Sequence, residues 1–202
     1  MPSSPELLRV APNLWIWQVF DPAVKSELFA TAIGNGVALF VIDPIPLERS
    51  LFEEIETDRA VEAVLVTNAN HLRAAPEFAL RLGCPILATS KVLEEFAPAE
   101  GREIPAGGRI APGVTAIPIE GAAAGEAAFH FADDGGTIVL GDALINFDPY
   151  GFTFLPAKYC SDQRAMRRSL RQLLDWSCER LLFAHGTPIL SGGRARLETL
   201  LG

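Results

Sequence analysis

Two short and almost entirely apolar runs, residues 37–42 and 61–66, limit what this 202-residue chain can fold into. Neither run alternates apolar with polar residues, so each is typical of a strand that is buried on both faces. Between them Leu47, Leu51 and Ile55 recur at helical spacing among acidic residues. The chain is therefore predicted to alternate covered strands with amphipathic helices, as an α/β protein does.

The remaining segments extend this alternation along the chain. Runs rich in aromatic and branched residues predict strands, and apolar residues three and four apart predict helices. The first half opens with antiparallel strands, and the second half has its strands first and its helices last. The further predicted strands are 14–20, 27–33, 85–88, 114–119, 127–132, 137–140 and 180–183. The further predicted helices are 74–82, 91–96, 162–176 and 194–200.

The length predicts a single domain over residues 1–202, since a domain takes about 150 residues. The segment 97–113 carries several prolines and glycines. Strand-like runs resume on both sides of it, so we interpret it as a connector within one domain.

Charge and hydropathy exclude several classes of function. The chain has 17 basic and 25 acidic residues and a net charge of −8, which argues against neutralising a nucleic acid backbone. No apolar run approaches the ~18 residues needed to cross a bilayer. The first residues lack the pattern of a secretory signal, and three widely spaced cysteines fit a reducing compartment. We expect a cytoplasmic protein that binds neither nucleic acid nor membranes, and we leave open whether it forms an oligomer.

Three segments carry a resemblance to a known family. They are TNANHLR at residues 67–73, Gly141-Asp142 at the end of a predicted strand, and FAHG at residues 183–186. In this order they resemble the metallo-β-lactamase superfamily, whose members are largely metal-dependent hydrolases, and the resemblance covers essentially the whole chain. It implies a four-layer αββα sandwich of two mixed sheets, which the order of strands and helices in both halves permits.

The same comparison implies that most metal ligands of that family are replaced. The family's first motif is T-H-x-H-x-D-H, and placing Thr67 on its threonine puts Asn68 and Asn70 where the first two histidines stand. Leu72 then replaces the aspartate and Arg73 the last histidine. Four ligand positions of the first motif are lost.

Three further ligand positions lie later in the chain. Ala122 stands where the family has a histidine, whereas Asp142 matches its bridging aspartate and His185 its final histidine. Two of the seven positions remain. The resemblance therefore implies a degenerate cleft. Its residues are Asn68, Asn70, Arg73, Ala122, Asp142 and His185.

His71 occupies a spacer position in this alignment. A register that makes His71 a ligand would place Ala69, Arg73 and Ala74 at other ligand positions and would lose the match at Thr67. We therefore keep the first register. In it the side chain of His71 is expected to point away from the metal centre and to form hydrogen bonds at a loop edge.

The residues of the cleft predict that no metal binds. Asp142 and His185 are too few ligands for zinc, which takes at least three from the protein. The guanidinium of Arg73 cannot lose its proton, and its repulsion of a divalent ion costs on the order of several kcal/mol. We expect Arg73 to pair with Asp142, directly or through water, in place of a cation, with Asn68, Asn70 and His185 completing a hydrogen-bonded cluster.

The predicted function is that of a hydrolase homologue without a conventional pair of metal ions and without a cofactor, which is either an inactive homologue or a binder of a small-molecule ligand. No catalytic residue is assigned. One alternative is an active hydrolase with a residual mononuclear site at Asp142 and His185, holding one weakly bound Zn, Mn or Fe ion. Another alternative is a structural or partner-binding protein that presents the arginine-rich helix 162–176 or an edge strand.

Overall fold

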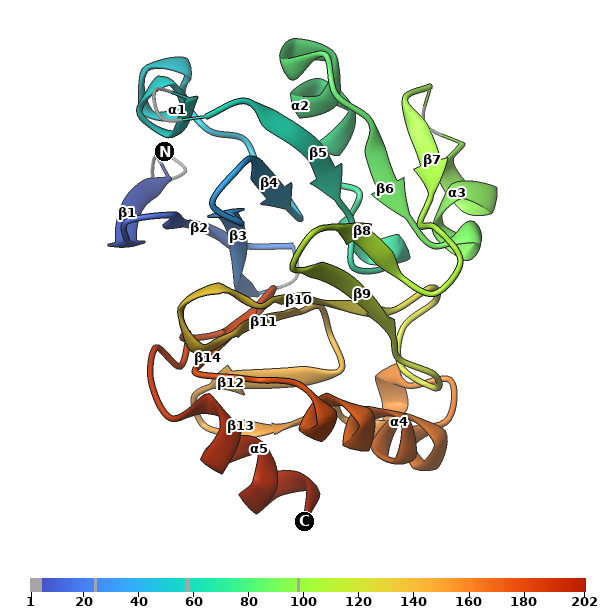
Figure 1. The fold of residues 1–202 in the computed structure, drawn as a ribbon. Coiled ribbons are helices and arrows are strands. Elements are labelled where there is room, and N and C mark those ends of the chain that lie inside the picture. The colour runs from blue at the N-terminus through green and yellow to red at the C-terminus, as the bar shows by residue number, and fades with distance from the viewer. Residues whose placement is uncertain (1–4, 24, 57–58, 98) are drawn as a thin grey trace.

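The structure is a computed structural model that describes residues 5–23, 25–56, 59–97 and 99–202. Two large mixed sheets lie face to face, and helices cover the outer face of each (Figure 1). The predicted four-layer αββα sandwich is therefore confirmed. Within the described ranges, none of the helices combines the length and the apolar content that a membrane crossing requires.

The first sheet has seven strands in the order in which they occur in the sequence. The strands up to β4 pair antiparallel, and those from β4 to β7 pair parallel. The strands are β1 (Glu6–Ala11), β2 (Leu14–Asp21), β3 (Ser26–Gly34), β4 (Leu39–Ile42), β5 (Val61–Leu65), β6 (Ile86–Ala88) and β7 (Gly101–Glu103). Its helices are α1 (Arg49–Glu56), the 3-10 turn η1 (Ala69–His71), α2 (Ala75–Leu82) and α3 (Ser90–Phe96).

The second sheet has five strands in the order β14-β11-β10-β9-β8, and a two-stranded hairpin, β12-β13, accompanies it. Its parallel pair is β11 with β14. The strands are β8 (Arg109–Ala111), β9 (Val114–Pro118), β10 (Ala127–Phe131), β11 (Thr137–Leu140), β12 (Leu144–Phe147), β13 (Gly151–Phe154) and β14 (Arg180–Phe183). The helices are η2 (Asp133–Gly135), η3 (Ala157–Tyr159), α4 (Gln163–Leu170), η4 (Arg171–Asp175) and α5 (Gly193–Leu201).

The predicted helix 162–176 is shorter than expected. Asp162 caps α4, because its side chain accepts hydrogen bonds from the amides of Arg164 and Ala165. The α-helix ends at Leu170, and the chain continues as the 3-10 helix η4. The 97–113 connector contains two three-residue strands, β7 and β8, which are too short to show a periodic pattern.

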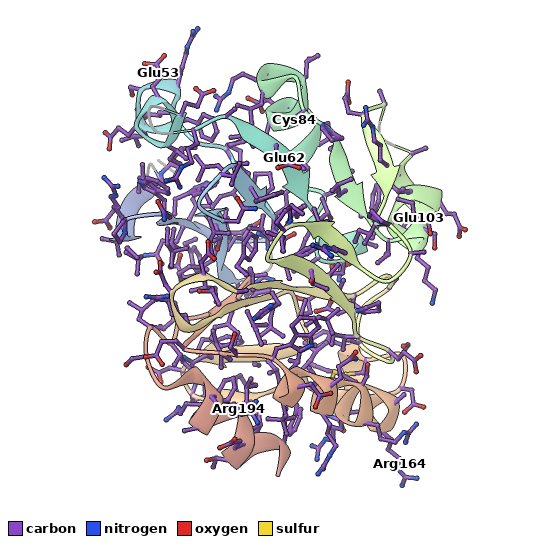
Figure 2. The ribbon with its side chains drawn as sticks, in the orientation of Figure 1. Glu53, Glu62, Cys84, Glu103, Arg164 and Arg194 are labelled. Carbon is purple, nitrogen blue, oxygen red and sulfur yellow. The ribbon has the colours of Figure 1, made fainter. Side chains whose placement is uncertain are left out.

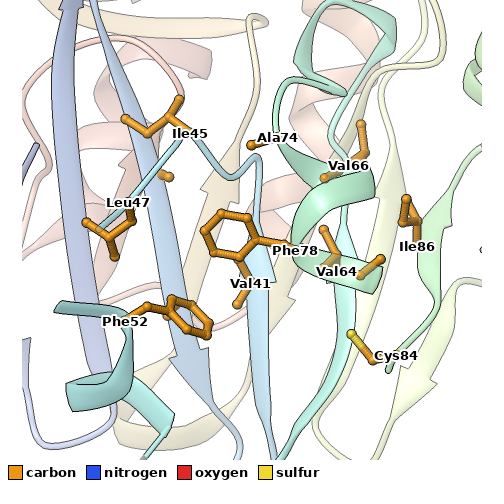
Figure 3. Close-up of a cluster of buried hydrophobic side chains, with 14 of the residues drawn as sticks. Val41, Ile45, Leu47, Phe52, Val64, Val66, Ala74, Phe78, Cys84 and Ile86 are labelled. Carbon is orange, nitrogen blue, oxygen red and sulfur yellow. The ribbon is translucent and has the colours of Figure 1, made fainter. Parts of the chain in front are cut away.

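The buried side chains form three layers. One layer lies between the first sheet and its helices, where Phe78 of α2 contacts Phe52 of α1 edge to face with ring centroids 5.0 Å apart (Figure 3). Consecutive residues of β5 point to opposite faces of the sheet. Val64 packs in the layer between the sheet and its helices, and Leu65 packs in the layer between the two sheets. This division explains why the run 61–66 carries apolar residues without alternation.

The third layer packs α4 and α5 against the second sheet through Met166, Leu170 and Leu197. Charged side chains lie on the outer surfaces of the helices, as Arg164 and Arg194 illustrate (Figure 2). The two sheets are thus fixed by apolar packing on every face, which leaves the strand ends to carry polar groups.

Candidate metal centre

Four strands deliver polar side chains to one place at their carboxyl ends. Asp43 follows β4, Thr67 follows β5, Asp142 follows β11 and His185 follows β14. Strands β4 and β5 of the first sheet run parallel, and so do β11 and β14 of the second sheet. The carboxyl ends of the two strands in each pair therefore lie at the same edge of their sheet. In open α/β sheets this edge is where ligands bind.

The turn after β5 brings His71 into this group. The side chain of Asn68 accepts a hydrogen bond from the amide of Asn70 at 2.8 Å and caps η1, which ends at His71. The Nδ1 atom of His71 then lies 2.7 Å from the hydroxyl of Thr67 and 3.0 Å from Oδ2 of Asp43. The prediction that His71 points away from the cleft was wrong, because the capped turn folds its ring back towards the strand ends.

The proton of the His71 ring is assigned by these contacts. The hydroxyl of Thr67 donates to Oδ2 of Asp43 at 2.5 Å, so it can only accept from Nδ1 of His71. A carboxylate likewise accepts and does not donate. Nδ1 of His71 therefore carries a hydrogen, and Nε2 is the atom that faces the centre of the cluster.

Three side chains turn potential ligand atoms towards one point. Nε2 of His71 lies 3.3 Å and Nε2 of His185 lies 3.4 Å from Oδ1 of Asp142. One ligand atom from each of the three side chains lies within 4.8 Å of the other two. The His71 side chain is 2 % exposed, and its Nε2 has no hydrogen-bond partner among the described residues.

The other oxygen of Asp142 is held by amides. The Nδ2 atoms of Asn68 and Asn70 each lie 3.1 Å from Oδ2 of Asp142. Asn68 Nδ2 also donates to Oε2 of the buried Glu126 at 2.6 Å, and Oε1 of Glu126 accepts from the amide of Ala143 at 3.0 Å. Both asparagines of the expected cluster thus lie beside Asp142, and Glu126 is a further partner that the sequence comparison did not identify.

Glu126 could have been noticed as the one acidic residue between apolar segments, since it follows AAAG at 122–125 and precedes AAFHF at 127–131.

Ala122 itself does not face the polar cluster. Its side chain is buried in the layer under the second sheet, and its carbonyl accepts from the hydroxyl of Ser161.

Arg73 does not form the predicted ion pair with Asp142. Its Nη1 donates to the carbonyl oxygens of Phe29 at 2.9 Å and Asp43 at 3.2 Å. The oxygens of Asp142 are already approached by two amides and two imidazoles, which leaves the guanidinium to hold the chain near β3 and β4. Within the described residues, Nη2 of Arg73 is buried without a hydrogen-bond partner.

Burial and charge set the protonation of the cluster. Burial lowers the pKa of His71, but the charges of Asp43 and Asp142 outweigh it and raise the pKa to about 9. Burial and repulsion from His71 lower the pKa of His185 to about 4. Burial acts to raise the pKa of Asp142, and the two histidines nevertheless hold it below its usual range. Burial and the charge of Asp142 raise the pKa of Glu126.

The fold and the cluster define the chain as an αββα sandwich with histidine and carboxylate groups at the ends of its strands. The sequence matches the family model of the metallo-β-lactamase superfamily over residues 7–202. The chain belongs to this superfamily. Comparison with curated proteins gives no match.

Solved structures of the same fold are similar to the chain at low sequence identity. A metallo-β-lactamase from Pontibacter korlensis is 13% identical, with a TM-score of 0.75, and the match covers 98% of this chain and 97% of that one. The metallo-β-lactamase DIM-1 is 13% identical, with a TM-score of 0.73, and covers 98% and 99%. FIM-1 from Pseudomonas aeruginosa, in a mono-zinc form, is 11% identical, with a TM-score of 0.68, and covers 99% and 94%.

Proposed function

We propose that the chain is a metal-dependent hydrolase that uses one divalent ion held by His71, Asp142 and His185. The observation that carries this proposal is the buried Nε2 of His71, which faces Asp142 and lacks a hydrogen-bond partner. Two imidazoles and one carboxylate form a donor set that suits a catalytic zinc ion, and also Mn or Fe. The mononuclear alternative at Asp142 and His185 thereby gains a third ligand.

The contacts behind the ligands also fit a metal site. Metal-binding histidines almost always donate a hydrogen bond from their second ring nitrogen to a carboxylate or a backbone carbonyl, and this bond fixes the tautomer. Nδ1 of His71 contacts the carboxylate of Asp43, and Nδ1 of His185 lies 3.3 Å from the carbonyl of Glu27. Both rings are therefore oriented with Nε2 towards Asp142, as ligands would be.

The balance of buried charge supports a cation. Asp43 and Asp142 are two buried carboxylates on either side of the His71 ring, and Arg73 donates to the backbone of Asp43 at the edge of the cluster. Buried charges are normally paired or coordinate a metal. A divalent ion at the three ligand atoms compensates the carboxylates, whereas in its absence a proton on His71 does so.

The chain's own residues hold and expose this site. A divalent ion, when bound, supplies Lewis acidity and a water molecule of lowered pKa. Asn68 and Asn70 fix Asp142 by its Oδ2 atom, and so leave Oδ1 directed at the histidines. The side chain of His185 is 18 % exposed and that of His71 only 2 %. A substrate therefore approaches from the side of His185.

Metal titration of protein stability tests the proposal. The wild-type protein, freed of metal by a chelator, should gain thermal stability on addition of micromolar zinc or manganese, because a ligand that binds only the folded state stabilises it. Asp142→Asn and His185→Gln should abolish most of this gain. His130→Gln is the matched control, since His130 contacts Ser177 and lies outside the cluster. Hydrolysis of generic esters, lactones and phosphodiesters should follow the same pattern.

A metal-free small-molecule binder is the second candidate. A cavity of about 1070 Å³ supports it, and this cavity is lined by Trp176, Gln172 and residues 115–121, among others. In that case ligands, and not metal ions, would raise the melting temperature. The acidic net charge and the three free cysteines favour a cytoplasmic protein without nucleic acid partners in either case.

A further inference from the structure

The hydrogen bonds of Asn68 have only one arrangement that satisfies all of them. Its Nδ2 donates to Oε2 of Glu126 and to Oδ2 of Asp142, and its Oδ1 accepts from the amide of Asn70. An amide group has two hydrogens to donate, and both are used here. Rotating the amide by half a turn would place its NH₂ against the amide hydrogen of Asn70 and its oxygen against the carboxylate of Asp142, so the direction of these bonds is fixed.

Glu126 reaches Asp142 by two routes. Its Oε2 accepts from Asn68, which holds the side chain of Asp142, and its Oε1 accepts from the amide of Ala143, the next residue in the chain. The approach is close, because a Cβ atom added at Gly141 would lie 2.8 Å from Oε1 of Glu126. One buried carboxyl group therefore holds the side chain of the proposed ligand, through Asn68, and also the backbone next to it.

We propose that Glu126 is a positioning residue, which acts through Asn68 and the amide of Ala143 to direct Oδ1 of Asp142 at His71 and His185. This inference rests on the proposed function, since the direction of Oδ1 matters for a bound ion. The partners of metal ligands typically change metal affinity by 10–100-fold when they are removed.

Packing alone does not account for a carboxylate at this position. Glu126 is 3 % exposed and stands between apolar segments, and a buried polar group is commonly no more stabilising than an apolar residue of the same volume. An apolar side chain could not accept hydrogen bonds from Asn68 and Ala143, so it could not orient Asp142 in this way.

The test replaces Glu126 by its amide in the otherwise intact protein. Glu126→Gln keeps the volume and can still accept from Ala143, but its Nε2 would face Nδ2 of Asn68, donor against donor. The zinc dissociation constant should rise about 10–100-fold. The visible absorption bands of the cobalt-loaded protein should also shift, because they report the geometry around the ion. Glu120→Gln, in the same loop but exposed, is the control and should change neither quantity.

A double-mutant cycle separates this route from packing. If Glu126 acts through Asn68, adding Glu126→Gln to Asn68→Ala should weaken zinc binding by clearly less than it does in the wild-type background. Equal effects in both backgrounds, or an unchanged dissociation constant and spectrum in Glu126→Gln, would overturn the inference while leaving the metal site in place. A wild-type protein that binds no divalent ion would contradict the proposed function and this inference with it.

Discussion

Replacing Asp43 by asparagine should disable the metal site without removing a ligand. Asp43 accepts from the amide of Thr67 at 2.8 Å, from the Thr67 hydroxyl at 2.5 Å, and lies 3.0 Å from Nδ1 of His71. Asparagine has the same shape and can still accept from the Thr67 amide. It also tolerates the left-handed backbone at this position, where φ is 47°.

The expected magnitude follows from the tautomer of His71. In Asp43→Asn an NH₂ group faces the Thr67 hydroxyl and Nδ1 of His71, so Nδ1 becomes an acceptor and the ring hydrogen moves to Nε2. A protonated Nε2 cannot bind a metal. We expect the zinc dissociation constant to rise at least 10–100-fold, which corresponds to about 1.4–2.8 kcal/mol of binding free energy.

Competition with a chromophoric chelator measures this constant directly. Asp133→Asn, the same change in the exposed turn between β10 and β11, is the control and should bind zinc as the wild type does. If Asp43→Asn and the wild type bind zinc with equal affinity, the argument that Asp43 sets the tautomer of a ligand is refuted.

Three further outcomes follow from the geometry. In the metal-free protein, the free energy of unfolding should fall by up to about 3 kcal/mol between pH 6.5 and about 9. The raised pKa of His71 is the cause, because its stabilising contribution is fully present below pH 6.5 and is lost as the pH rises through 9. Urea unfolding at several pH values should show this fall in the wild type and much less of it in His71→Gln. Gly141→Ala should lower the free energy of unfolding by about 1–3 kcal/mol, since its Cβ would lie 2.6 Å from the Thr67 hydroxyl and 2.8 Å from Nδ2 of Asn68, and a melting temperature equal to the wild type's would contradict the packing argument. Phe78→Ala should cost about 3–5 kcal/mol in denaturant unfolding, because Phe78 is 2% exposed and packs on Phe52 and Trp17; a loss below 1 kcal/mol would mean that the layer under α2 can collapse.

The fold could be predicted from the sequence because its strongest signals are local. The uninterrupted run 37–42 and the helical spacing around Leu51 depend on which faces are buried, and burial follows from apolar residues alone. The three-residue strands β7 and β8 could not be predicted, since their pairing partners lie outside the segment and nothing within it repeats. Helix 162–176 was extended too far because apolar spacing continues through η4, where the hydrogen bonding changes.

The candidate site was harder to predict because it depends on the path of one loop. Asp142 and His185 were identified because Gly141-Asp142 and residues 183–186 resemble segments of the family, and the structure brings the two side chains together. Alignment to a motif treated His71 as a spacer, since spacing assumes that the loop keeps the motif's path. The capped turn at Asn68 directs His71 towards Asp142, which spacing alone does not reveal, and Glu126 enters from a separate segment that no motif marks. Side-chain direction in loops is a tertiary property.

A crystal structure of the zinc-loaded protein tests the central claim most directly. We expect one peak of anomalous scattering per chain, in contact with Nε2 of His71, an oxygen of Asp142 and Nε2 of His185. A pair of peaks, a peak that does not touch His71, or zinc-soaked crystals with no peak at these residues would contradict the account.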